Sequence, residues 1–522
     1  MNGTVLLENL SFYPPPVSPP FGQAAAPIFC RPAFPMTRIL FTLLIGHFFS
    51  FASPVFASED EVETASFSLD HVLGKMMYDS ALNRTDYGVQ VVNVHTGEEV
   101  FARNADQSLV PASVMKVLTG AVALRELGPG YKFSTYVSTK STIDSSGTLT
   151  GDLYVQGFGD PTLVTEDLWR LVYDLWLTGI RRIEGDVIYD DAFFDRDRLI
   201  DGWRKEVDLA NGPAYFAPLG ALSVNFNTAC LVVGPGGATG EEANVTLEAP
   251  SKSINLINRV KTGPRRSRPS LSVMRSNKGG GKVEFKVSGS IPAEAAPSRM
   301  YRTIIDPMAQ FMSVFGGHME DRGIEVAGDH RSGRIEDGLR IVARKESASL
   351  PTILARMNKY SSNFVAEHVL KAVGAEVYGV PGTTEKGLRV VAEYLESLGA
   401  EQDEFTLVNG SGLSRDIELR PSHINSVMID MAADRILGPE FTASLAIGGV
   451  DGTLWTRFRG DGVEGRLRGK TGRLNHVHGL TAYVDGGDGE LYAFTFLVND
   501  IPTHSRAIRS LHTRFGQAIL DL

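Results

Sequence analysis

The two ends of the chain predict antiparallel strand pairs with helices beside them, whereas the middle has a different pattern. Alternating apolar residues at 87–94 and 99–102 flank a turn and predict a β-hairpin near the start. The segments 480–484 and 491–498 predict a second hairpin near the end. Between the hairpins, short β-like segments dominate residues 228–345. We therefore expect a discontinuous α/β domain that is interrupted by a long insertion.

The second half of the chain also predicts several helices. Apolar periodicity indicates helices over residues 349–373 and 385–398, and a last helix from about 503 to 519. The stretch 264–282 is basic and rich in glycine, and we interpret it as a solvated loop in preference to an anion site.

Composition limits the classes to which the protein can belong. The 522 residues include 51 Lys+Arg and 61 Asp+Glu, which gives a formal net charge of −10. This acidic balance argues against a nucleic-acid binder, because such a protein needs a clustered basic surface. Cys30 and Cys230 are the only two cysteines, too few for a disulfide scaffold or a thiolate zinc site. The 43% hydrophobic content is ordinary for a globular protein, and the length of the chain suggests several domains.

Residues 1–57 predict a leader, with a secretory signal peptide at 36–57. Arg38 precedes an apolar run, and small residues before position 58 predict cleavage after Ala57. An uncleaved membrane anchor is the alternative, because the apolar segment is nearly long enough to span a bilayer. Cleavage would leave an exported protein with no integral membrane anchor.

Ser113-Val-Met-Lys116 is the first of three short motifs that can carry chemistry. Residues i and i+3 share one face of a helix, so the serine hydroxyl and the lysine amine can approach each other. A serine hydroxyl needs an adjacent base to become a nucleophile. A lysine serves as that base if its pKa is lowered.

The second motif, Ser361-Ser362-Asn363, offers a hydroxyl for proton relay and an amide to hold a carbonyl. The triplet Ser223-Val224-Asn225 has the same pattern and competes for this role. The third motif is Lys470-Thr471-Gly472, just before the C-terminal hairpin. Its lysine and threonine hydroxyl can bind a carboxylate, and its glycine leaves room for a substrate backbone.

Together the three motifs form the signature of penicillin-binding proteins and class A β-lactamases. The interval from position 113 to position 361 is 248 residues, and that from 361 to 470 is 109 residues. With so long a first interval the chain resembles the penicillin-binding protein 4-type D-alanyl-D-alanine carboxypeptidases, the low-molecular-mass class C group. Four further segments look like that family: 157–162, 217–225, 409–414 and 449–453.

The resemblance implies a transpeptidase/β-lactamase-like α/β fold, in which helices flank an antiparallel sheet. The catalytic domain would comprise residues 58–133 and 336–522. Residues 134–158 and 228–335 would form an inserted β-rich domain, and residues 159–227 a second inserted α/β domain.

The same resemblance implies roles for the motif residues. Ser113 would be the nucleophile, Lys116 its base, and Ser361 and Asn363 the other catalytic residues. The substrate would be bound by Lys470, Thr471, Gly472 and Arg473, with the backbone N–H groups of Ser113 and Arg473 as the oxyanion hole. Two positions depart from the family pattern: Ser362, where many relatives carry Asp, and Arg473, where Ser or Thr is usual. These departures make the substrate preference open.

The activity implied is that of a serine-type D-Ala-D-Ala carboxypeptidase acting on peptidoglycan stem peptides through an acyl-serine intermediate. β-Lactams would be covalent inhibitors, and no cofactor or metal is expected. Endopeptidase cleavage of cross-links stays open, because it uses the same acyl-enzyme. A β-lactamase-like hydrolase and a non-catalytic peptidoglycan-binding protein on the same fold are the alternatives. The predicted signal peptide implies a periplasmic or otherwise exported protein.

Overall fold

The computed structural model describes residues 69–200, 203, 212–502 and 505–521. These residues belong to one unit of the chain, Ser66–Leu522. The expected signal peptide at 36–57 and Cys30 lie outside the described residues. Cys230 is a free, half-buried thiol. Among the described helices, none combines the length and the apolar character needed to cross a membrane.

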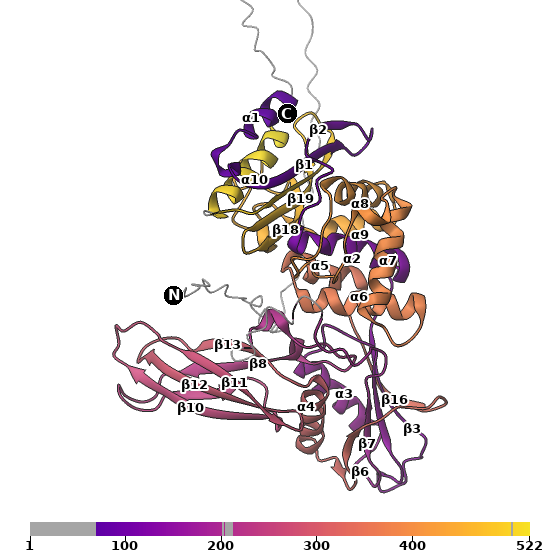
Figure 1. The fold of residues 1–522 in the computed structure, drawn as a ribbon. Coiled ribbons are helices and arrows are strands. Elements are labelled where there is room, and N and C mark those ends of the chain that lie inside the picture. Colours follow the sequence, from indigo (N-terminus) through magenta and orange to yellow (C-terminus); the bar gives the residue numbers. More distant parts are fainter. Residues whose placement is uncertain (1–68, 201–202, 204–211, 503–504, 522) are drawn as a thin grey trace, which may run out of the picture. The chain divides into compact units, whose positions relative to one another are not determined.

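Strands from both ends of the chain form one six-stranded antiparallel sheet (Figure 1). Its order is β17-β18-β19-β20-β1-β2. The strand β1 from the start pairs with β20 from the end, from Asp86 opposite Asn499 to Asn93 opposite Tyr492. The strand bounds are β1 Asp86–Asn93, β2 Glu99–Arg103, β17 Ala446–Ile447, β18 Leu467–Leu474, β19 Val477–Asp485 and β20 Leu491–Asn499.

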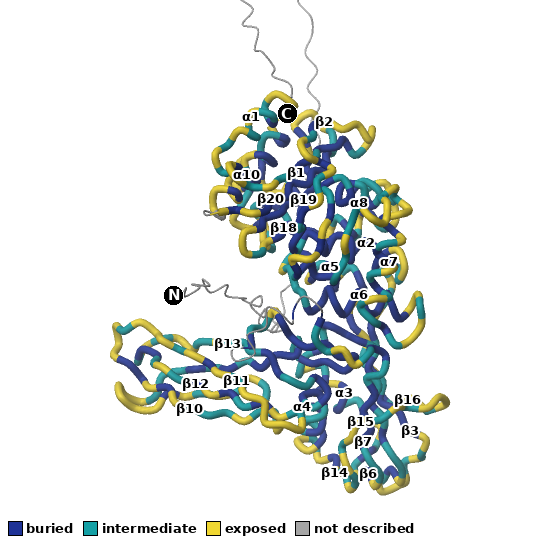
Figure 2. Tube along the Cα trace, in the orientation of Figure 1, coloured by how far each residue is buried: buried dark blue, intermediate teal, exposed yellow. Residues whose placement is uncertain are grey.

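Helices cover both faces of this sheet, which is why β19 and β20 are almost entirely buried (Figure 2). Helices α1 (Leu69–Met76) and α10 (Ser505–Leu520) pack on one face. The other face packs against a helical layer that contributes to a separate apolar cluster. That layer comprises α2 Lys116–Leu127, α5 Leu350–Lys359, α6 Asn363–Tyr378, α7 Thr384–Ser397, α8 Pro421–Ala433 and α9 Leu437–Ser444.

The described strands between residues 134 and 346 pair in other sheets. A five-stranded sheet has the order β15-β7-β5-β3-β16, and a short one the order β14-β6-β4. Helices α3 (Thr165–Leu177) and α4 (Pro307–Asp321) pack with these strands in one apolar cluster. The strand bounds are β3 Ser134–Thr139, β4 Thr148–Leu149, β5 Leu153–Gly157, β6 Arg182–Ile183, β7 Val187–Asp190, β14 Glu325–Val326, β15 His330–Ser332 and β16 Arg340–Glu346.

Two three-stranded sheets, β10-β12-β11 and β13-β8-β9, share a further apolar cluster. Their bounds are β8 Thr228–Gly234, β9 Asn244–Leu247, β10 Ile254–Gly263, β11 Ser272–Gly279, β12 Lys282–Pro292 and β13 Ser298–Thr303. The expected loop at 264–282 is wrong over its second half, because β11 lies there. Only Val273 of β11 is buried, so the strand carries little of the alternating apolar signal by which strands are recognised.

The strand pairing differs from the expected grouping of the insertion. We expect residues 134–158 in the β-rich part with 228–335, yet β3 and β5 pair with β16 and β7. The domain borders themselves stay a prediction.

A buried ion pair ties helix α6 to the segment around residue 195. The side chain of Lys371 is 1% exposed, and its Nζ lies 2.7 Å from Asp195 Oδ1 and 3.0 Å from the Asp197 carbonyl. A buried ammonium needs its counter-charge, because removing one partner leaves the other charge uncompensated.

We predict that Asp195→Ala lowers the free energy of unfolding by about 3 kcal/mol, as measured by urea denaturation. Glu336→Ala is the control, because Glu336 forms an ion pair with Lys140 that is solvent-exposed on both sides. This control should leave the unfolding midpoint unchanged. Equal effects of the two substitutions would contradict a structural role for the buried pair.

Candidate active site

Ser113 lies in a short 3-10 helix, Ala112–Met115, that leads directly into α2. The preceding residue, Ala112, has a φ of +48°, a left-handed conformation that is unfavourable for an L side chain. The backbone of Gly412 holds it from the other side: a Cβ on Gly412 would lie 1.9 Å from the Ala112 carbonyl oxygen. The chain is thus fixed immediately before the serine, which is half-buried.

Lys116 is fully buried one helical turn after Ser113. Its Nζ lies 2.9 Å from Ser113 Oγ, 2.8 Å from Asn363 Oδ1 and 2.6 Å from the Ser411 carbonyl oxygen. Two of these three oxygens can only accept hydrogen bonds. A neutral amine that donates its two N–H groups to them directs its lone pair at the Ser113 hydroxyl.

Burial lowers the pKa of Lys116 to about 7, and the nearby carboxylate of Glu367 opposes this shift. Burial and the proximity of Lys116 also hold the pKa of Lys470 well below its usual range. At neutral pH a large fraction of Lys116 is therefore unprotonated and able to accept a proton.

A tight turn at 409–413 fixes the carbonyl that holds Lys116. Glu367, buried on α6, accepts hydrogen bonds from Gly410 N at 3.1 Å and Ser411 N at 2.8 Å. Asn409 Oδ1 accepts from Gly412 N at 2.9 Å and closes the turn. Burial raises the pKa of Glu367, while the two N–H donors and Lys116 favour its carboxylate form.

The second motif lies where the expected helix 349–373 breaks into α5 and α6. Ser361 has a φ of +57°, which no helix interior tolerates, and Ser362 caps α6 by accepting from Val365 N. The break places Asn363 at the first turn of α6, with its amide oxygen on Lys116. Sequence periodicity missed this break, because the apolar pattern continues across it.

The competing triplet at 223–225 lies elsewhere. Ser223 is 2% exposed and donates to the Gly220 carbonyl at 2.6 Å, and Asn225 bonds to Thr165. Of the two triplets, Ser361-Ser362-Asn363 is the one that contacts the motif lysines, with Asn363 on Lys116 and Ser361 on Lys470.

The third motif lies on β18. Lys470 Nζ lies 2.9 Å from Ser361 Oγ and 2.6 Å from the Thr471 carbonyl. A Cβ on Gly472 would lie 2.5 Å from the Pro111 carbonyl oxygen, so only glycine lets this strand approach the start of the Ser113 helix. On the opposite face of the strand, Thr471 Oγ1 lies 2.9 Å from Thr453 Oγ1.

The site contains two lysine–serine pairs, Lys116–Ser113 and Lys470–Ser361, and Asn363 also contacts Lys116. It can supply a nucleophilic hydroxyl, a neutral amine as base and a second hydroxyl for proton relay. The described residues contain no group of three or more His, Cys, Asp or Glu that could hold a metal ion.

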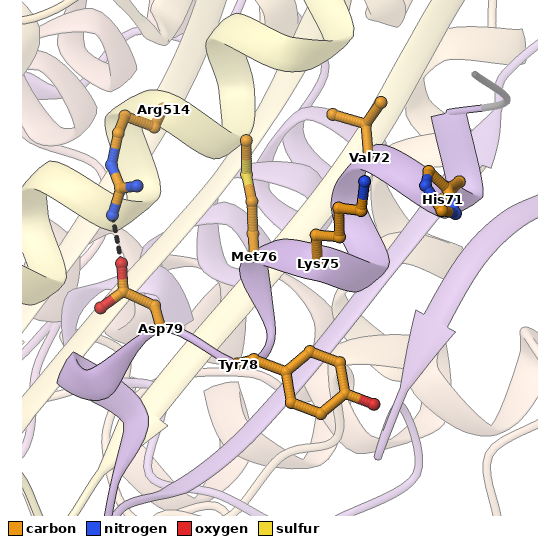
Figure 3. A pocket seen from close by; sticks show the side chains of 7 residues that line it. All are labelled: His71, Val72, Lys75, Met76, Tyr78, Asp79 and Arg514. Atoms are coloured by element: carbon orange, nitrogen blue, oxygen red, sulfur yellow. Dashed lines mark hydrogen bonds and ion pairs between the residues drawn. The ribbon is translucent and has the colours of Figure 1, made fainter.

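A hollow between α1 and α10 contains none of the motif residues (Figure 3). Its lining includes the exposed Tyr78 and an ion pair between Arg514 and Asp79. It is separate from the lysine–serine pairs.

Residues 69–515 match the family model described as the D-Ala-D-Ala carboxypeptidase 3 (S13) family. The chain belongs to this family. It is 35% identical over 490 residues to a D-alanyl-D-alanine carboxypeptidase of Actinomadura sp. (strain R39), covering 91% of this chain and 87% of that one. It is 24% identical over 426 residues to the D-alanyl-D-alanine carboxypeptidase DacB of Haemophilus influenzae, covering 80% and 86% of the two chains.

The crystal structure of penicillin-binding protein 4 from Haemophilus influenzae has the same fold as this family member. The TM-score is 0.73 at 24% identity, over 85% of this chain and 97% of that one. A structure of the same protein complexed with a β-lactam gives a TM-score of 0.70 at 23% identity, with the same coverage. The expected α/β, transpeptidase-like fold and the resemblance to carboxypeptidases are confirmed.

Sequence reasoning about this family member missed the residues that hold Lys116 in place. Glu367 and Ser411 belong to no catalytic motif, and Ser411 acts through its backbone carbonyl. The segment 409–414 resembles the family, and its two glycines within six residues are the visible signal of a tight turn. What the turn holds cannot be read from that pattern.

We predict that Glu367→Gln shifts the pH dependence of serine acylation. The rate should rise with pH as Lys116 loses its proton, with a midpoint near the Lys116 pKa of about 7. Removing the carboxylate removes an interaction that raises this pKa, so the midpoint should move to lower pH. Pre-steady-state acylation rates at pH 5 to 9 measure it.

Asp160→Asn is the matched control, because Asp160 is 4% exposed and accepts hydrogen bonds within its own loop in the insertion. This control should leave the midpoint in place. An unmoved midpoint in Glu367→Gln would show that Glu367 does not act on Lys116.

Proposed function

We propose that this carboxypeptidase is an exported enzyme that removes the terminal D-Ala of peptidoglycan stem peptides through an acyl intermediate on Ser113. The observation that carries the proposal is the contact of the buried Lys116 amine with the Ser113 hydroxyl at 2.9 Å. The two acceptor oxygens on the amine and its lowered pKa support its role as base.

In the acylation step, Ser113 Oγ attacks the carbonyl carbon of the penultimate D-Ala and its proton passes to Lys116. The C–N bond then breaks, and the departing amine takes up a proton through the hydroxyl of Ser361. The short contact of Ser361 Oγ with Lys470 Nζ supports this relay, since Lys470 can return a proton to the Ser361 hydroxyl after it has donated its own.

Developing negative charge on the carbonyl oxygen would be stabilised by the backbone N–H groups of Ser113 and Arg473. The close approach of β18 to residues 111–114, which Gly472 permits, supports this arrangement. Water would then hydrolyse the ester and release the shortened peptide.

The terminal carboxylate of the substrate would be bound by Lys470, Thr471 and Arg473, with Gly472 leaving room for the substrate backbone. Charge complementarity supports this assignment, because Arg473 is an exposed cation two residues after Thr471, on the same face of β18. Asn363 would hold a substrate carbonyl in addition to its contact with Lys116.

Cleavage of cross-links would use the same acylation. Digesting purified muropeptide monomers and cross-linked dimers and identifying the products distinguishes carboxypeptidase from endopeptidase activity. The signal peptide expected at 36–57 supports export to the periplasm or beyond the membrane, where the substrate lies.

β-Lactams should acylate Ser113, since they present a strained amide to the same nucleophile. A stable adduct indicates the peptidase, rapid turnover a β-lactamase-like hydrolase, and no adduct a binding protein. Intact mass after penicillin treatment separates these outcomes, and Ser113→Ala should carry no adduct.

We predict that Lys116→Arg folds normally but is acylated by penicillin at least ~100-fold more slowly, the lower range for loss of a general base. Arginine keeps the charge but does not release its proton at neutral pH. Stopped-flow acylation measures the rate, and Lys470→Arg is the comparison, because it should mainly weaken capture of the carboxylate. Near wild-type acylation of Lys116→Arg would exclude Lys116 as the base.

A further inference from the structure

Five basic side chains gather beside β18, on the face of the sheet that α10 covers. This basic cluster consists of Arg457, Arg473, His478, Arg509 and His512, which lie close enough to act on one another electrostatically. Arg473 and His478 are partners in the β18–β19 pairing, so their side chains lie on the same face. Arg457 reaches α10, where its Nε donates to Thr513 Oγ1 at 2.9 Å and a terminal nitrogen donates to the Arg509 carbonyl at 3.5 Å.

The two histidines form the buried floor of the basic cluster. His478 is 4% exposed and His512 is 1% exposed, with the His512 ring 4.7 Å from that of Phe496. His512 Nε2 has no hydrogen-bond partner among the described residues. Burial and the neighbouring arginines lower the pKa of His478 to about 4. The histidines are thus neutral at pH 7, and the charge of the cluster is that of its three arginines.

No carboxylate of the described residues forms an ion pair with these three arginines, whereas Arg514 on the same helix is paired with Asp79. Burial and Arg509 lower the pKa of Arg457 to about 10, the direction expected of a cation held beside another cation. Three guanidinium groups without a counter-ion repel one another, and a bound anion removes that cost. Guanidinium groups bind carboxylates in bidentate fashion.

The position of the basic cluster indicates which anion it meets. Side chains of residues i and i+2 share one face of a strand, so Thr471 and Arg473 point the same way, about 7 Å apart. Thr453, on the other side of Thr471, precedes Arg457 by four residues. A substrate whose terminal carboxylate binds at Thr471 therefore places the side chain of its last residue next to the cluster.

We propose that the basic cluster is an anion subsite for the leaving group, and that the enzyme favours substrates whose leaving group carries a second carboxylate. The inference rests on the proposed function, since it uses the carboxylate position assigned to Thr471. It also explains why this chain has Arg473 where relatives usually have Ser or Thr, because a guanidinium reaches a carboxylate that a hydroxyl at this position does not.

The test compares two N-acetylated tripeptides that differ only in the last residue, D-Ala or D-Glu, with the purified enzyme. We expect kcat/KM at low salt to be about 5-fold higher for the D-Glu peptide, the upper range for an exposed charge pair. The ratio should fall toward one in Arg509→Gln and in high salt, and be largely retained in Arg509→Lys. Arg514→Gln, on the same helix but outside the cluster, should leave both rates unchanged.

A wild-type ratio at or below one would overturn the subsite, as would a preference that survives Arg509→Gln. If the D-Ala peptide is cleaved in either case, the proposed function stands and only the subsite fails. If neither peptide is cleaved, the proposed function fails and the subsite falls with it.

Discussion

The removal of the Lys116 amine from water is the constraint on which the rest of the site depends. A charged ammonium without solvent is costly, and burial brings its pKa to about 7. Three oxygens from three parts of the chain surround the amine: Ser113, Asn363 and the carbonyl of Ser411. Each must be placed to a fraction of an ångström, so the elements that carry them are fixed by other means.

Backbone conformation supplies that precision. Left-handed residues at Ala112 and Ser361 interrupt regular structure just before Ser113 and at the serine that contacts Lys470. Glycines at 412 and 472 allow two segments of the chain to approach the start of the Ser113 helix so closely that any side chain there would collide with its backbone. The strain at the first two positions is tolerated because buried helices and the six-stranded sheet hold the flanking residues in place.

Much of this organisation could be predicted from the sequence, for identifiable reasons. The hairpins at both ends follow from strong alternation, and the three motifs predicted which residues meet around Ser113. The break before Asn363, the role of Glu367 and the pairing of β3 and β5 with β16 and β7 could not be predicted. A continuing apolar pattern hides the break, and backbone contacts and strand partners leave no local signal. Strand β11 could not be predicted either, because nearly all of its side chains are exposed and its sequence lacks the alternating apolar pattern of a strand.

We propose that Lys116 is a neutral base in the free enzyme at physiological pH. Its protonation can be followed directly by NMR of the lysine Cε resonances in isotopically labelled protein, with Lys116→Arg to assign the signal. We expect a titration midpoint near 7 for the Lys116 amine. A Lys116 signal that stays that of an ammonium up to the ordinary lysine range near ~10.4 would contradict it.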